Sequence, residues 1–322
     1  MSKIWEIEYW SVDDQRKWLN EKYYDIPYET IRLVIPENTP RRRNFGFLRA
    51  IELGVEYMIA IDDDNLPMEA DWLRGHLDAF DLPVMNYVSS KNTFVNPCAG
   101  LSLNHRRVYL RGYPISEMLR DSFVFGGGRG KPVIANMGLW KNKPDVDAYT
   151  NIKYPDLKSD GIDKNIMWNN EKLAITKDNY FPLNTQNTIM HKDALVVWFQ
   201  PHMDKELGID RHDDIWSGYI IEKIAHHLGH TLTFGTPLSN HDRNTHSYEK
   251  DLSYELFGDA LNPHIIEKIR KTKLRKDSYL DCYAEIVDSL ENITSNDPDI
   301  REYLNTLTFS MRTWIRMVKR LL

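Results

Sequence analysis

The fold is decided by the stretch Tyr57-Met58-Ile59-Ala60-Ile61-Asp62-Asp63-Asp64. An unbroken apolar run that ends abruptly in charged residues predicts a buried strand with an acidic tip. Upstream, Ile31–Ile35 has the composition of another short strand and is followed by a break at Pro36. Between the two, Arg43–Leu53 has apolar residues at helical spacing, with Gly54 as its cap. Strand, helix and strand indicate a parallel α/β sheet covered on both faces, in which ligands bind beyond the carboxyl ends of the strands.

The rest of the chain divides into a mixed part and a helical part. We expect further helices at Asp71–Phe80 and Asp213–Leu228, and further strands at Val84–Ser89, Pro132–Trp140 and Leu232–Gly235. Two segments are interpreted as loops, the surface segment Lys141–Lys177 and a mobile lid at Gly126–Gly130. After Ser247 the pattern is helical, at Tyr248–Phe257, Pro263–Leu274, Tyr279–Leu290 and Asp299–Leu322. We therefore predict a GT-A-like core domain of mixed sheet and helices over residues 1–246, and a helical appendage over residues 247–322.

Composition excludes several classes of protein. The chain has 322 residues, and its net charge of -6 argues against a surface covered in basic groups for nucleic acid. Two cysteines, Cys98 and Cys282, are too few for a disulfide scaffold or a cysteine-built zinc site. We interpret His226, His227 and His230 as structural, because they lack the spacing of a helical zinc pair. Neither a signal peptide nor the run of about 20 apolar residues that a membrane span needs is visible, so we expect a cytoplasmic protein without an integral membrane segment.

Three adjacent aspartates at the tip of a strand point to a metal site. Like charges at close range repel and burial increases the penalty, whereas a bound divalent cation removes it. Mn²⁺ or Mg²⁺ prefers carboxylate oxygens and keeps positions open for substrate phosphates. We expect Asp62 and Asp64 to hold this ion, with Asp63 directed toward a sugar or ribose. The alternative is a solvated loop tip in which one aspartate caps a helix.

Two later motifs carry further polar groups. Asp213 and Asp214 begin a predicted helix, whose dipole keeps carboxylates ionised, so either can take a proton from an attacking hydroxyl or bind a sugar hydroxyl. Their alternative role is to cap that helix. His241 and Arg243 follow the strand-like Leu232–Gly235. The imidazole could complete the coordination of the metal, and the arginine could meet a phosphate.

Together these stretches resemble the reversibly glycosylated polypeptides, a family that includes the plant UDP-arabinopyranose mutases. The matching stretches are Ile59-Ala60-Ile61-Asp62-Asp63-Asp64, Arg111-Gly112-Tyr113-Pro114, Gly138-Leu139-Trp140-Lys141-Asn142-Lys143-Pro144-Asp145-Val146-Asp147-Ala148, Phe181-Pro182, Arg211-His212-Asp213-Asp214-Ile215-Trp216-Ser217-Gly218 and His241. The resemblance implies a GT-A fold, UDP-sugar binding, and dependence on Mn²⁺ or Mg²⁺ through the matching aspartates. It also implies that Arg111 matches an arginine that becomes reversibly glycosylated, while a second arginine of the family is replaced here by Met118.

These observations define one set of candidate residues. The catalytic candidates are Asp213, Asp214 and Arg111, and the metal candidates are Asp62, Asp64 and His241. The candidates for binding the nucleotide sugar are Asp62, Asp63, Arg43, Asn44, Arg243 and Trp140. GT-A domains usually open with a strand and a nucleotide-binding loop, whereas Lys3–Trp10 resembles a second strand. We therefore expect part of the base pocket to be missing, unusual or supplied by another chain.

The motifs lead to three hypotheses of function. The favoured one is a metal-dependent glycosyltransferase with a UDP-sugar donor and an unknown acceptor, which could be a glycan, lipid, protein or modified nucleic acid. The metal would neutralise the leaving diphosphate, and Asp213 or Asp214 would orient or deprotonate the acceptor. The first alternative is a UDP-sugar mutase with Arg111 as a covalent or holding group. The second is a catalytically silent scaffold that partners an active relative, and a homo- or hetero-oligomer fits each hypothesis.

Overall fold

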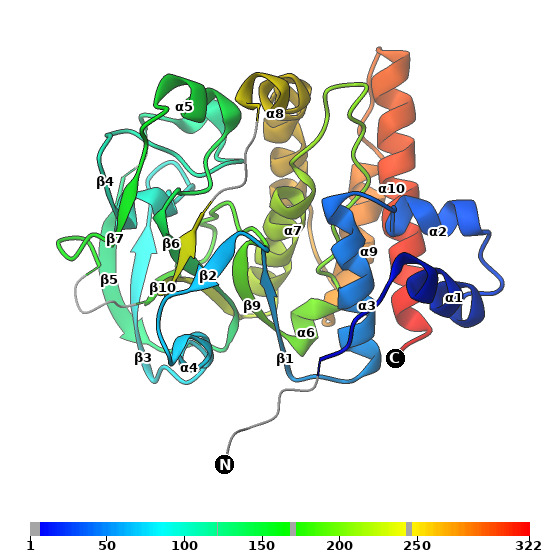
Figure 1. The fold of residues 1–322 in the computed structure, drawn as a ribbon, viewed down its shortest axis with the longest axis horizontal. Helices are drawn as coiled ribbons and strands as arrows, with labels where there is room; N and C mark the ends of the chain where they lie inside the picture. Colours follow the sequence, from blue (N-terminus) through cyan, green and yellow to red (C-terminus); the bar gives the residue numbers. More distant parts are fainter. Residues whose placement is uncertain (1–6, 121, 168–171, 243–246) are drawn as a thin grey trace.

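The computed structural model describes residues 7–120, 122–167, 172–242 and 247–322, and shows helices packed around one large sheet (Figure 1). The helices are α1 (Val12–Lys22), α2 (Tyr28–Val34), α3 (Asn44–Glu52), α4 (Trp72–Leu77), α5 (Ala148–Lys153), α6 (Lys192–Leu195), α7 (Asp213–His227), α8 (Tyr248–Lys271), α9 (Tyr279–Leu290) and α10 (Pro298–Lys319). Short 3₁₀ turns are η1 (Pro40–Arg43), η2 (Pro97–Gly100) and η3 (Ile115–Glu117). The strands are β1 (Tyr57–Ile61), β2 (Asn65–Pro67), β3 (Val84–Ser89), β4 (Leu101–Leu103), β5 (Val124–Arg129), β6 (Val133–Asn142), β7 (Ser159–Ile162), β8 (Lys172–Ile175), β9 (Asn187–His191) and β10 (Thr231–His241).

In the described part of the chain the strands form one mixed sheet. Its order is β1-β9-β6-β10-β8-β3-β5, while β2 pairs with β10, and β7 pairs with both β4 and β6. The pairs β10 with β6 and β3 with β8 are parallel, and the other pairs are antiparallel. The predicted α/β class, with a GT-A-like mixed sheet flanked by helices and a helical carboxyl-terminal part, is therefore confirmed.

This topology collects the polar motifs at one edge of the sheet. β6 and β10 are parallel, and β1 has the same direction because β9 lies antiparallel to both β1 and β6. The carboxyl ends of these three strands therefore lie at the same edge. α7 starts there as well, because Asp214 in its first turn lies within ion-pair reach of the Arg111 side chain that also binds Asp145, just after β6. The sheet thus places side chains from distant motifs within reach of one another.

The helices cover the sheet and share its core. α7 packs on β10 and is covered by α8 and α9, whereas α10 packs on α2 and α9. Figure 1 shows α1, α2, α3, α9 and α10 gathered beside the sheet on the side of β1. One hydrophobic cluster includes side chains from the sheet and from α8, α9 and α10. None of the helices in the described residues combines the length and hydropathy of a membrane span. A cytoplasmic location and the domain border at residue 246 stay predictions.

Two segments near the start of the chain, Ile31–Ile35 and β1, differ from the sequence prediction. Ile31–Ile35 lies mostly in helix α2 and not in a strand, because Ile31 and Val34, three residues apart, are both buried where α2 packs on α10. A short apolar run does not distinguish a strand from one face of a helix. β1 is a strand as predicted, but it ends the sheet order and pairs antiparallel with β9. The prediction of a parallel strand buried on both faces is therefore wrong.

Other corrections concern segments rich in glycine, proline and polar residues. Gly126–Gly130 is not a lid loop, because most of it lies in β5, which pairs with β3 and is separated from β10 by β3 and β8. The predicted loop Lys141–Lys177 contains α5, β7 and β8. Helix α8 continues through Pro263 as one helix, where two were predicted. Beside Pro263, the Asn262 side chain accepts from the Trp216 indole and donates to the Gly112 carbonyl. Of the strand predicted at Lys3–Trp10, residues 7–10 are not in a strand, and the rest lies outside the described residues.

We predict that Asn44→Ala lowers the free energy of unfolding by about 3 kcal/mol in urea titrations, because backbone groups buried without partners are costly. Asn44 is fully buried, and its amide donates to the carbonyls of Val34 and Gln200 and accepts from the Gln200 N–H, at 2.7, 2.8 and 2.9 Å. The exposed Asn20 on α1 is the control, and Asn20→Ala should change stability by less than about 0.5 kcal/mol. A loss at Asn44 no larger than the loss at Asn20 would contradict the role of this side chain as a clamp.

Candidate active site

The acidic residues form a tight turn between β1 and β2. The Asn65 N–H donates to the Asp62 carbonyl at 3.0 Å, so Asp63 and Asp64 occupy the middle of the turn. β2 then pairs with the end of β10, where Asn65 lies opposite His241. As a result Oδ2 of Asp64 lies 3.4 Å from Nε2 of His241. The turn therefore brings together two of the three predicted metal ligands.

His241 is held in one orientation by the backbone. Its Nδ1 lies 2.6 Å from the carbonyl oxygen of Lys143, and its side chain is 2% exposed. A carbonyl only accepts, so Nδ1 carries the hydrogen, and a neutral ring then has its lone pair on Nε2, facing Asp64. Histidine ligands of metal ions are commonly held in this way by a backbone carbonyl. The donor chemistry of Asp64 and His241 therefore fits a divalent cation.

Asp62, the third predicted metal ligand, faces Arg43 instead. Nη2 of Arg43 lies 2.6 Å from Oδ1 of Asp62, and Nη1 donates to the Thr185 hydroxyl at 2.5 Å. Burial raises the pKa of Asp62, and the Arg43 guanidinium opposes this shift. Within the described ranges, no three His, Cys, Asp or Glu side chains lie together as a ready metal site. The metal role of Asp62 stays a prediction.

Arg111 is buried between two carboxylates. Its Nε and Nη2 donate to Asp145 at 3.2 and 3.1 Å, and its Nη1 and Nη2 donate to Asp214 at 3.0 and 2.8 Å. Nη1 also donates to the carbonyl of Arg211. Gly112 follows with φ +79°, and a Cβ there would lie 2.3 Å from Cγ2 of Ile215, so glycine permits the close approach of α7. Every guanidinium nitrogen of Arg111 is thus engaged, and the guanidinium ties the start of α7 to the segment after β6.

The two carboxylates at the start of α7 have different environments. Burial alone would raise the pKa of Asp214, but the Arg111 guanidinium outweighs it and holds this pKa below its ordinary value. Burial, followed by repulsion from Asp214, raises the pKa of Asp213 to about 6. No hydrogen bond or ion pair of the Asp213 side chain is found among the described residues. Asp213 therefore has a carboxylate that can exchange protons near neutral pH.

Four candidates for binding the nucleotide sugar need comment. Asn44 is fully buried and clamps backbone, and Trp140 is fully buried in β6, so neither side chain can touch a ligand in this arrangement. The prediction that these two side chains bind the nucleotide sugar is therefore corrected. Both lie close in sequence to polar residues of the site, but their own side chains belong to the core. Asp63 is exposed at the turn. Arg243 lies outside the described residues, so its predicted contact with a phosphate stays a prediction.

Sequence reasoning missed part of the polar cluster. Asp145 binds Arg111 and accepts from the Asn184 amide at 2.9 Å. Arg211, just before the carboxylate pair, donates to Glu255 of α8 at 2.5 Å. The Asp-x-Asp pattern after β6 was the available signal for Asp145. No periodicity marks Asn184 or Glu255, because their roles depend on the packing of separate segments.

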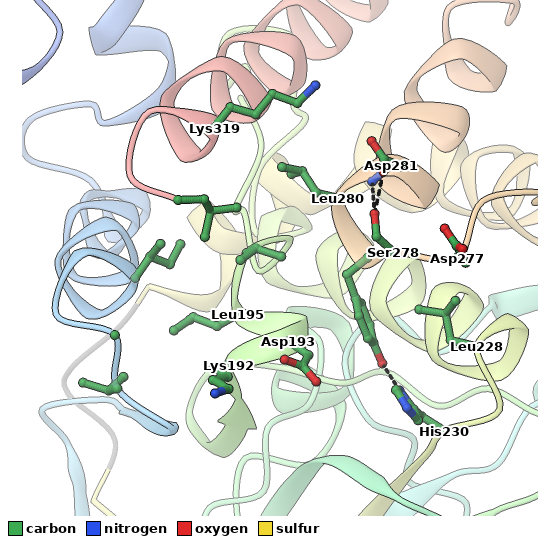
Figure 2. Close-up of a pocket in the computed structure, with 16 residues that line it drawn as sticks. Lys192, Asp193, Leu195, Leu228, His230, Asp277, Ser278, Leu280, Asp281 and Lys319 are labelled. Carbon is green, nitrogen blue, oxygen red and sulfur yellow. Dashed lines mark hydrogen bonds between the residues drawn. The ribbon is translucent and has the colours of Figure 1, made fainter.

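A cavity of about 760 Å³ lies elsewhere in the molecule. It is lined by Gly54 and Val55, which precede β1, and by residues around α6, α9 and the end of α10. Figure 2 shows Leu195, Leu228 and Leu280 facing this cavity, with Lys192, Asp193 and Asp281 around them. Because the acidic turn follows the other end of β1, this cavity does not hold the candidate catalytic groups.

Comparison with known proteins identifies the family. A family model described as "Reversibly glycosylated polypeptide" matches residues 32–322. The chain belongs to the reversibly glycosylated polypeptide family. It is 27% identical over 278 residues to probable UDP-arabinopyranose mutase 1 of Pisum sativum, a match that covers 85% of this chain and 69% of that protein. It is 26% identical over 278 residues to UDP-arabinopyranose mutase 2 of Arabidopsis thaliana, with 85% and 70% covered.

In this reversibly glycosylated polypeptide we predict that Arg111→Met lowers the free energy of unfolding at pH 7.5 by about 3 to 5 kcal/mol, because it leaves two buried carboxylates uncompensated. Burial alone would raise the pKa of Asp214, and Arg111 is what outweighs it. Without Arg111 this carboxylate should take up a proton as the pH falls, which relieves the penalty of a buried, unpaired charge. The deficit of the variant should therefore shrink between pH 7.5 and pH 5 in urea titrations.

Two further variants make this prediction specific. Arg111→Lys keeps the charge without the double hydrogen bonds, so its deficit should be smaller. Arg32→Met removes a half-exposed arginine paired with Glu29 and should cost less than about 1 kcal/mol. A deficit of Arg111→Met that does not change with pH would contradict the electrostatic explanation.

Proposed function

We propose that this protein is a UDP-sugar mutase that interconverts the pyranose and furanose rings of a UDP-pentose such as UDP-arabinose. The observation that carries the proposal is a split between two adjacent carboxylates. Arg111 donates to both oxygens of Asp214, whereas no hydrogen bond or ion pair of the Asp213 side chain is found among the described residues. Such a split is typical of carboxylate pairs in which one stays ionised and the other exchanges protons. The names of the relatives, UDP-arabinopyranose mutases, support this function over the transferase that the sequence motifs favoured.

Ring interconversion exchanges one carbon–oxygen bond for another. The bond between C1 and the diphosphate breaks, and its electron pair goes to UDP. A different sugar hydroxyl then bonds to C1 and loses its proton, after which the bond between C1 and the former ring oxygen breaks and that oxygen gains a proton. The UDP oxygen finally bonds to C1 again, so the product is an isomer of the substrate. One group that accepts a proton and returns it suffices, and we assign this role to Asp213.

The diphosphate would bind at the turn between β1 and β2. The charge and donors of Arg43 suit a phosphate oxygen, which would replace Asp62 as its partner. Asp64 and His241 would hold a divalent cation, which when bound neutralises charge on the leaving diphosphate. Asp62 would then be released from Arg43 and become available as a second carboxylate ligand.

We assign Arg111 a positioning role. Its three nitrogens already donate to Asp145, Asp214 and the Arg211 carbonyl, and the two carboxylates outweigh burial and hold its pKa well above the ordinary value. A nucleophilic guanidinium would have to lose a proton and leave these partners. The positions of Asp213 and Asp214 depend on this cluster, so Arg111 acts on the sugar through them.

We predict that the protein converts UDP-arabinopyranose to UDP-arabinofuranose without an acceptor, as measured by separation of the two nucleotide sugars by chromatography. Asp213→Asn should lower kcat about 100-fold or more and change KM little, because it removes proton exchange but keeps the shape. In the unmodified protein kcat should fall about tenfold for each pH unit below about 6, as Asp213 becomes protonated. The exposed Asp160 on β7 is the matched control, and Asp160→Asn should keep full activity.

The same incubation separates the rival functions. Release of UDP without a ring-isomerised product would favour the glycosyltransferase, since the donor would then react only with water in place of its acceptor. Binding of UDP without any turnover would favour a silent scaffold. Full activity of Asp213→Asn would contradict the assigned role of this carboxylate, even if the mutase reaction is found.

We also predict that Mn²⁺ strengthens the binding of UDP in isothermal titration calorimetry and that Asp64→Asn removes this metal-dependent gain, a loss of about tenfold or more in affinity. The exposed Glu69 lies shortly after β2 and provides the control, so Glu69→Gln should retain the gain. Circular dichroism would verify that Asp64→Asn is folded. An unchanged effect of Mn²⁺ in Asp64→Asn would show that this carboxylate does not hold the ion.

A further inference from the structure

A second, strongly basic cavity lies at the far end of α7 from the carboxylate pair. Its volume is about 610 Å³. It is formed by the last turns of α7 and α8, the segment after α8, and the segment after β8. Its lining residues are Lys177, Asp178, Tyr180, Lys223, His226, His227, Arg270, Lys271, Thr272, Lys273, Leu274 and Arg275.

The charge of this cavity contrasts with that of the chain. Six of its lining side chains are lysine or arginine and one, Asp178, is acidic, although the whole chain has a net charge of -6. Glu267 pairs with Lys271 at 2.7 Å and with Arg270 at 3.5 Å, so two of the cations are partly neutralised. Within the described ranges, Lys177, Lys273 and Arg275 form no ion pair. Like charges that are concentrated in a hollow without partners favour a bound anion.

The ends of the two helices explain only part of this charge. Cations commonly gather near the carboxyl end of a helix, where they complement its dipole and its last carbonyls. Here Lys223 donates to the Arg270 carbonyl at 2.6 Å, and the Thr272 hydroxyl donates to the Lys268 carbonyl at 2.8 Å. These two contacts serve the end of α8, and they leave the charges on Lys177 and Lys273 unexplained.

A second observation, independent of the charge, also points to a ligand, and it concerns His226. Its side chain is 7% exposed, and in the described part of the molecule neither ring nitrogen has a hydrogen-bond partner. The ring stands edge-on to Tyr180 at 5.4 Å, and the Arg270 guanidinium lies 5.6 Å from the centre of the same Tyr180 ring. Buried polar groups are nearly always hydrogen-bonded. The unpaired imidazole N–H of His226 is therefore expected to donate to an acceptor that the protein itself does not supply.

We propose that this cavity is a binding site for a small soluble anion with one or two phosphoryl groups. A phosphoryl group has three acceptor oxygens and carries most of two negative charges near neutral pH, which matches a set of converging cations and one imidazole N–H. His226 is more than nine-tenths buried and is the second-last residue of α7, whereas a flat bilayer surface would reach only the exposed lysines at the rim. The site is separate from the proposed diphosphate site, because it lies at the opposite end of α7.

Calorimetric titration of the full-length protein with inorganic pyrophosphate, in EDTA, tests this assignment. Lys177→Gln with Lys273→Gln should weaken binding about tenfold or more, since both side chains are exposed and their loss should not disturb the fold. Lys17→Gln with Lys158→Gln changes the net charge equally at exposed lysines elsewhere and should leave the affinity unchanged. Arg43→Gln removes any pyrophosphate bound in the proposed diphosphate site and should leave the binding that depends on Lys177 and Lys273.

A second readout follows His226 itself. In the unmodified protein, pyrophosphate should shift the imidazole proton resonances of one histidine, and His226→Gln should remove that signal. Loss of binding in Arg43→Gln, equal weakening by both lysine pairs, or an unshifted His226 resonance would each overturn the proposal. Binding to vesicles of anionic phospholipid without binding of pyrophosphate would overturn it too, because the basic surface would then serve a membrane and not a soluble anion.

Discussion

The structure depends on one buried electrostatic cluster, in which the Arg111 guanidinium lies between the carboxylates of Asp145 and Asp214. The three side chains come from a loop, from the segment after β6 and from the first turn of α7. Two carboxylates at this depth would repel each other and favour their neutral forms, so the arginine is what permits these segments to meet. Its planar fork also fixes direction, since it contacts both oxygens of each carboxylate. The cluster is therefore both a structural tie and the source of the asymmetry between Asp213 and Asp214.

The sheet and this cluster together explain why the chemistry gathers at one place. β1, β6 and β10 end at the same edge, which brings the acidic turn, Asp145 and His241 together. Arg43 lies between the two halves of the site, because it pairs with Asp62 while the charges of Asp213 and Asp214 help to raise its pKa against the effect of burial. These carboxylates offset the cost of burying the Arg43 guanidinium. Under the proposed function, Arg43 would meet the diphosphate and Asp213 would meet a sugar hydroxyl.

Helix α7 links this edge to the rest of the molecule. It begins with the carboxylate pair and ends beside the basic cavity, and its 15 residues correspond to roughly 22 Å of helix. Along it, the buried Glu222 carboxyl accepts from the Phe181 N–H at 3.0 Å, and burial raises its pKa well above the ordinary value. The segment that starts at Phe181 contains Asn184 and Thr185, which bind Asp145 and Arg43. One rigid helix therefore positions groups in the site both directly and through the segment that packs beside it.

The sequence alone determined the features that depend on neighbouring residues. The strand that ends in the acidic turn, the helix that begins at Asp213 and the helix Tyr279–Leu290 follow from local periodicity, and the motifs around Asp62, Arg111 and Asp213 indicated the family. Only the tertiary structure decided the antiparallel pairing of β1, the helical state of Ile31–Ile35, the edge-strand role of the glycine run and the burial of Asn44 and Trp140. It also decided that Arg111 meets Asp214, 103 residues away in the chain. Periodicity records which residues are apolar along a segment, whereas strand partners and buried ion pairs depend on which distant segments pack together.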